Sequence, residues 1–311
     1  GQANGKVSMK GLWLAGFDEF TPRQQELIET LKAAGCRVTV LEPADAPRPA
    51  AHTALPDRPA EILAAARWAR AALESGGARR VGIVIPELAA VRHAVARIFD
   101  EILVPAALLP QSHEPARPYN ISLGTALAEV PLVHTALLIL EWADQPLAFP
   151  EAGSLLRSPF LAAAEAEMTQ RALLDAELRR LGEIKVPVET ILRYAAAEAR
   201  VGHAPRLAER LHSWHGAVKA LPRQQPPSAW SESFARLLSL LGWPGERTLT
   251  SEEFQAVEAW RKLLPVLSGL DLVRPALSYG EALRFLRRLP AETIFQPQTP
   301  EVPVQVLGLL E

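Results

Sequence analysis

The sequence has one cysteine and no long apolar run. Cys36 is the only cysteine in 311 residues, so no disulfide can form within the chain. That suits a reducing compartment and predicts a cytoplasmic protein. The residue lies in the strand-like run of residues 36–43, and we interpret it as a buried structural thiol rather than a nucleophile. No run reaches the roughly 20 apolar residues that cross a bilayer, so no membrane partner is expected.

A large excess of charge of either sign is also missing. The formal net charge is −2, so binding to nucleic acid would need a local basic patch. The composition is 49% hydrophobic and 22% charged, which argues against a disordered chain and allows a sizeable core. The length leaves room for two domains, or for one domain with a large insertion.

A phosphate-binding loop is the third absence. The sequence contains no G-x-x-x-x-G-K-[ST] pattern, whose backbone amides would hold the phosphates of a nucleotide. The one Gly-Lys pair, Gly5-Lys6, falls in residues 1–9, which we predict to be a flexible leader. We therefore expect no cofactor and no intact ATPase.

Two weak patterns for metal chemistry are incomplete. Glu183 and Lys185 form an acid-x-Lys pair of the kind found in nucleases, but no aspartate precedes them on a strand. His203, His212 and His215 could ligate zinc, yet no cysteine or suitably spaced acid completes the set. We expect no metal site and interpret these side chains as solvated or packed.

The first part of the chain alternates strand and helix signals. An apolar run at residues 11–17 precedes a helix start, where Thr21 suits the N-cap and Pro22 the first helical position. Further helices are predicted at 60–75 and 87–103, and strands at 36–43, 79–87 and 106–110. This rhythm predicts an α/β region over residues 10–120, with a parallel sheet and helices on its faces.

The pattern then changes to helices. Residues 121–290 contain a series of helix-patterned segments separated by Pro, Gly and Ser, without a fixed repeat. Residues 291–311 are strand-like again, and the final run resembles a strand that is cut short, which suggests a piece of a longer protein. We predict that a parallel sheet is interrupted by an all-α inserted subdomain and then resumes.

This layout resembles the UvrD/RecB/AddB group of superfamily 1 helicases and helicase–nucleases. The resemblance implies a RecA-like (P-loop NTPase-like) fold with a large helical insertion. The stretch "AGFDEFTPRQQ" is similar to the AddB form of a motif that in active members ends a strand in Asp-Glu. The matching positions are Gly16, Phe17, Phe20, Thr21, Pro22 and Gln24.

In that alignment the motif lacks the two acidic side chains that it has in active members. The metal-holding Asp falls on Ala15 and the catalytic Glu on Gly16, so this Walker B-like region could neither hold magnesium nor activate water. Asp18 and Glu19 then lie past the strand, with Gln24 beyond them. A second alignment places Asp18-Glu19-Phe20 on the acidic motif, but its glutamine then comes too early.

The resemblance is closest to the proteobacterial group of probable DNA repair proteins. It implies a non-hydrolysing, DNA-guiding scaffold segment of a DNA repair and recombination exonuclease. The nuclease domain, of the PD-(D/E)xK type, would lie beyond Glu311. The implied partner is DNA, in single-stranded form. The alternative is an interaction module that docks a partner helicase subunit.

The sequence offers two kinds of residue that could contact DNA. Arg284, Arg287 and Arg288 share one face of a predicted helix and could meet phosphates, although a solvated face is the plainer interpretation. Arg179 and Arg180 form a smaller basic pair. Tryptophans could stack on bases, although we favour packing within a helical bundle. Those in the helical part are Trp142, Trp214, Trp230, Trp243 and Trp260.

Overall fold

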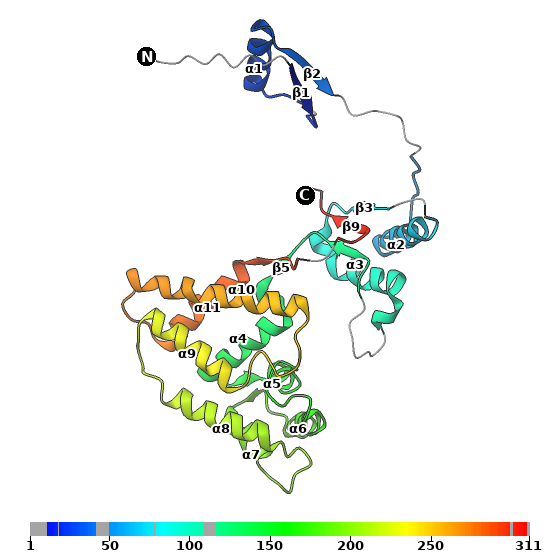
Figure 1. Ribbon diagram of the computed structural model, residues 1–311. Coiled ribbons are helices and arrows are strands. Elements are labelled where there is room, and N and C mark those ends of the chain that lie inside the picture. Colours follow the sequence, from blue (N-terminus) through cyan, green and yellow to red (C-terminus); the bar gives the residue numbers. More distant parts are fainter. Residues whose placement is uncertain are drawn as a thin grey trace, which may run out of the picture. The chain divides into compact units, whose positions relative to one another are not determined.

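The computed structural model describes residues 11–17, 19–41, 50–76, 79–108, 116–298 and 301–309 (Figure 1). The chain is mixed α/β and largely helical, with small parallel and antiparallel sheets. It divides into two compact units, residues 1–56 and 57–311. The predicted leader, residues 1–9, lies outside the described residues.

The first unit contains two parallel strands and one helix. Strand β1 (Gly11–Ala15) pairs in parallel with β2 (Arg37–Leu41), and α1 (Pro22–Ala33) connects them. The helix starts as the sequence predicts. Thr21 is the N-cap, its backbone N–H donates to Gln24 Oε1 at 2.8 Å, and a proline occupies the first turn.

A three-stranded parallel sheet lies in the second unit. Its order is β3 (Val81–Val84), β9 (Val304–Leu307) and β4 (Tyr119–Ile121), so the last strand in sequence lies between the two earlier ones. Alternate residues of each strand pack with α2 (Arg58–Glu74) and α3 (Leu88–Leu103) in one apolar core. The strands predicted within 79–87 and near the end of the chain are therefore confirmed.

One predicted strand is wrong. Residues 105–108 form a 3₁₀ turn, η1 (Pro105–Leu108), where the sequence analysis placed a strand at 106–110. The physical reason is local, because Pro105 fixes its own φ angle and the following alanines have a low preference for strands. The strand that joins the sheet after α3 is β4.

The helical body, residues 127–292, contains the expected helices. Its short strands β6 (Leu147–Ala148) and β7 (Lys185–Val186) pair antiparallel. Prolines occupy the first turns of several helices, where the missing N–H costs nothing. The helices and 3₁₀ turns are η2 (Leu127–Glu129), α4 (Pro131–Asp144), α5 (Phe149–Leu156), α6 (Met168–Leu181), α7 (Val188–Ala195), α8 (Pro205–Lys219), α9 (Pro227–Leu240), α10 (Ser251–Ser268), η3 (Gly269–Leu272) and α11 (Tyr279–Glu292).

The chain enters and leaves the helical body through two paired strands. Strand β5 (Thr125–Ala126) pairs antiparallel with β8 (Ile294–Phe295). Gly124 allows this approach, because a Cβ at that position would lie 2.6 Å from Ile294 Cγ2 and 2.7 Å from the Phe295 carbonyl oxygen. The entry and exit segments are thereby held side by side.

Tryptophans fill the core of the helical body. Trp214, Trp230 and Trp260 are buried to 1% exposure or less, and Trp142 is also buried. This confirms packing within the bundle and removes these side chains as stacking platforms for bases. Among the helices in the described ranges, none combines the length and the apolar character needed to cross a membrane.

Candidate functional site

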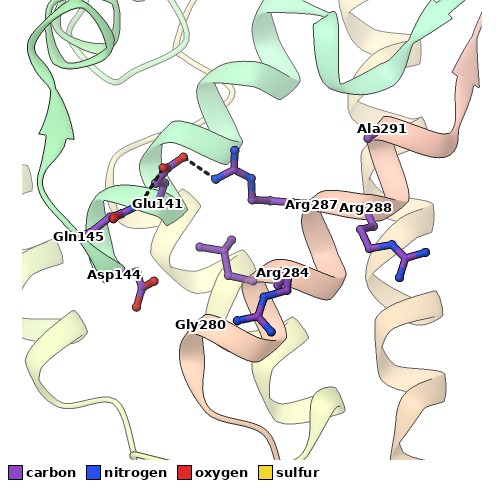
Figure 2. Close-up of a pocket in the computed structure, with 9 residues that line it drawn as sticks. Glu141, Asp144, Gln145, Gly280, Arg284, Arg287, Arg288 and Ala291 are labelled. Carbon is purple, nitrogen blue, oxygen red and sulfur yellow. Dashed lines mark hydrogen bonds and ion pairs between the residues drawn. The ribbon is translucent and has the colours of Figure 1, made fainter.

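Helices α4 and α11 line a groove of about 420 Å³ (Figure 2). Helix α11 begins with a capping box, in which Ser278 Oγ accepts from the Glu281 N–H and the Glu281 carboxylate accepts from the Ser278 N–H. Ala282 and Leu286 then pack into the core of the helical body. Helical periodicity places three exposed arginines on the outer side: Arg284, Arg287 and Arg288.

These three arginines differ in their partners. Arg287 Nη1 lies 2.7 Å from Glu141 Oε2 on α4, and this glutamate is only 16% exposed. Arg288 forms an exposed i,i+4 pair with Glu292 at 3.0 Å, a contact that contributes little to stability. Arg284, which Figure 2 labels on the same helix, has neither a hydrogen bond nor an ion pair with any described residue.

The opposite wall of the groove is acidic and comes from α4. Glu141 accepts from Arg287 through one oxygen and from Gln145 Nε2 at 3.0 Å through the other, so both of its oxygens are engaged. Asp144 has no hydrogen bond or ion pair within the described part of the chain. A Cβ on Gly280 would lie 3.5 Å from Asp144 Oδ2, in ordinary van der Waals contact, so Gly280 lies directly beside this carboxylate.

The charge of Asp144 affects the neighbouring tyrosine. Tyr279 packs inside the helical body and donates its hydroxyl to the Leu140 carbonyl oxygen at 2.7 Å. Burial, and then the negative charge of Asp144, raise the pKa of the Tyr279 hydroxyl. Tyr279 is therefore neutral at physiological pH and links α11 to α4 behind the groove.

The residues that the sequence analysis compared with a Walker B-like motif lie in the first unit. Ala15 is the last residue of β1, and Gly16 follows it with a φ angle of 78°, which favours glycine. Glu19 is exposed beyond the strand, and Gln24 is engaged in the cap of α1. Asp18 lies outside the described residues. Cys36, the predicted structural thiol, is free and buried.

Two of the candidate histidines lie close to polar groups of the helical body. His215 Nε2 lies 3.2 Å from Glu189 Oε1, and His203 Nδ1 lies 3.1 Å from the Ala195 carbonyl oxygen. No cluster of metal-ligating side chains occurs in the ranges that the structure describes. Glu183 precedes β7 and Lys185 is the first residue of that strand, and both side chains are exposed. Arg179, finally, pairs with an aspartate on its own helix.

A buried charge network in the helical body was missed by the sequence analysis. Glu167 caps α8, since its two carboxylate oxygens accept from the Arg206 and Leu207 N–H groups at 2.7 and 3.0 Å. Arg171 Nη2 lies 3.5 Å from Glu167 Oε2, and both side chains are nearly inaccessible. Burial lowers the pKa of the Arg171 guanidinium, and the carboxylates of Glu167 and Glu246 oppose that decrease.

No model of a known protein family matches the chain, and no curated protein matches it significantly. The resemblance to helicase–nucleases therefore stays a hypothesis, and the function is proposed from the groove and the fold.

Proposed function

We propose that the chain is a helicase-like, non-hydrolysing segment that guides single-stranded DNA in a DNA repair exonuclease. The observation that carries this proposal is the set of three arginines on α11 that line a groove. Guanidinium groups bind phosphates well, and a groove can follow a flexible single strand. The absence of a phosphate loop from the sequence favours guidance over ATP-driven movement.

The arrangement of strands supports the helicase-like part of the proposal. Strand β9 follows the helical body in sequence, yet it pairs in parallel with β3 and β4, which precede that body. We therefore propose a RecA-like α/β region over residues 10–120 and 291–311, interrupted by a helical insertion at 121–290. The pairing of β5 with β8 is the contact expected where such an insertion begins and ends.

The partners of the arginines limit how many phosphates the groove can bind. Arg287 pairs with the largely buried Glu141, whereas the pair of Arg288 with Glu292 is exposed and weak, so Arg284 and Arg288 are the arginines of the groove that can bind phosphates. Each phosphate contact with single-stranded DNA contributes about −0.7 to the log-log salt slope. The structure thus reduces the expected steepness of the salt dependence, from a slope of about −2 for three contacts to about −1.4 for two.

The proposal predicts a specific loss of DNA binding. The double variant Arg284→Ala/Arg288→Ala should bind single-stranded DNA much more weakly, and the salt slope should become flatter by about 1.4. Each exposed substitution should change the free energy of unfolding by no more than about 0.5 kcal/mol. Fluorescence anisotropy of a labelled oligonucleotide at several salt concentrations measures both affinity and slope.

Arg236→Ala is the matched control. Arg236 is exposed on α9 and has no ion pair among the residues that the structure describes, so its replacement should leave the slope unchanged. The proposal is wrong if the wild-type chain does not bind DNA at low salt, or if the double variant binds as the wild type does.

A second candidate function is docking of a partner helicase subunit, and the first unit favours it. Trp13 is 69% exposed, Leu41 is 46% exposed, and both lie on the same face of the β1–β2 pair. Parallel sheets are normally covered on both faces, and an isolated pair of strands has little stability. A protein that supplies an apolar surface would complete this unit.

The docking function predicts that Trp13 is an important contact. Trp13→Ala should weaken association with the helicase subunit by about 30-fold, the effect of removing an interface tryptophan worth about 2 kcal/mol. Trp68→Ala, which removes a 58%-exposed tryptophan on α2, should not change the affinity. Isothermal titration of the purified proteins measures both. Equal affinities for the wild type and Trp13→Ala would exclude this surface.

A further inference from the structure

The groove between α4 and α11 contains one free charge of each sign. Arg284 on α11 and Asp144 on α4 both line it, both are exposed, and no ion pair joins them (Figure 2). The remaining charged groups already have partners, since Glu141 binds Arg287 and Gln145 while Arg288 binds Glu292. A ligand that carries an anion and a hydrogen-bond donor would satisfy both free groups at once.

The Asp144 carboxylate is exposed on the wall of the groove, beside Gly280. Gly280 faces the Asp144 carboxylate without a side chain, and even an added Cβ would be in ordinary van der Waals contact, 3.5 Å from Oδ2. An ionised carboxylate only accepts hydrogen bonds, so a ligand atom placed beside it has to be a donor. The groove as a whole has a volume of about 420 Å³.

We propose that Asp144 reads the base of a bound single strand, so that the groove prefers bases with an exocyclic amino group, such as cytosine, over thymine. This inference rests on the proposed DNA-guiding function. Arg284 and Arg288 would hold phosphates, and the Asp144 carboxylate would accept a hydrogen bond from the N4 amino group of cytosine. Acidic side chains accept from this group in specific nucleic-acid recognition.

Thymine is a poor ligand for the same carboxylate. It has no amino group, and its one N–H donor lies between two carbonyl oxygens, which repel a negative charge. The preference for cytosine is expected to be about tenfold, near the lower end of what one specific base contact contributes. Glu141 is not expected to accept a hydrogen bond from the base, because its two oxygens already accept from Arg287 and Gln145.

The test compares oligo(dC) with oligo(dT) of equal length, each titrated into the complete chain at neutral pH and low salt. The wild-type chain should bind oligo(dC) about tenfold more tightly. In Asp144→Asn, the affinity ratio should fall to about 1, because the new amide can donate to the O4 atom of thymine as well as accept from cytosine. Circular dichroism establishes that the variant is folded.

Glu292→Gln is the control for charge. It removes a carboxylate that pairs with Arg288 at the same helix face, so both oligonucleotides should bind more tightly while their ratio stays the same. Equal binding of the two oligonucleotides by the wild type would overturn the role of Asp144 and leave the DNA-guiding function standing. A preference that persists in Asp144→Asn would also overturn it. Failure of both oligonucleotides to bind would instead refute the proposed function.

Discussion

Trp230→Ala is expected to destabilise the helical body by about 4 kcal/mol, within the range for removal of a fully buried tryptophan. Trp230 has 0% exposure and donates its indole N–H to the Leu277 carbonyl oxygen at 2.9 Å. Its ring lies 5.8 Å from Phe234 and meets Tyr279 edge-on at 5.3 Å. The variant therefore leaves a cavity, loses two aromatic contacts and removes a hydrogen bond. Urea denaturation followed by circular dichroism measures the change.

Two controls separate these contributions. Trp230→Phe keeps most of the aromatic volume and loses the donor to Leu277, so it should cost much less than the alanine variant. Trp68→Ala removes a tryptophan that is 58% exposed and should change stability by only about 0.5 kcal/mol. A loss for Trp230→Ala no greater than that for Trp68→Ala would contradict the packing of this core.

Glu167→Ala should be similarly damaging, because it breaks the buried network that joins α6 to α8. The substitution removes two hydrogen bonds to the first turn of α8 and leaves the buried Arg171 guanidinium without its nearest carboxylate. Removal of one partner from a buried ion pair typically costs about 3–5 kcal/mol. The same denaturation experiment measures this loss.

Glu209→Ala is the matched control on α8. Glu209 is exposed and has no ion pair with a described residue, so its loss should change the free energy of unfolding by about 0.5 kcal/mol or less. Restoring part of the stability in Glu167→Leu/Arg171→Met would support the electrostatic explanation, since an apolar pair leaves no unpaired charge. If Glu167→Ala were as mild as Glu209→Ala, the network would not stabilise the fold.

Local signals were sufficient for many elements of the fold. The N-cap at Thr21 depends only on residues of the first helical turn. Strands β3 and β9 each form from a short apolar run that the sequence shows directly. The prediction at 106–110 failed because short apolar runs do not distinguish a strand from a tight turn when β-branched residues are missing. The sequence analysis also did not predict that β1–β2 and β3–β9–β4 form two different sheets, since strands can pair with partners far away in the sequence.

The sequence by itself determined which arginines share a face of α11, because helical periodicity and the buried positions of that helix fix this locally. Only the tertiary structure decided what those arginines face. Glu141 and Asp144 lie some 140 residues earlier in the chain, and packing of α4 against α11 brings them to the same groove. Whether a charged side chain has a partner depends on such packing. Arg287 forms an ion pair with Glu141, while Arg284 and Asp144 have no ion pair with a described residue. The sequence could therefore locate the basic face of α11. Which of its arginines are free to bind a ligand depends on side chains that only the fold brings close.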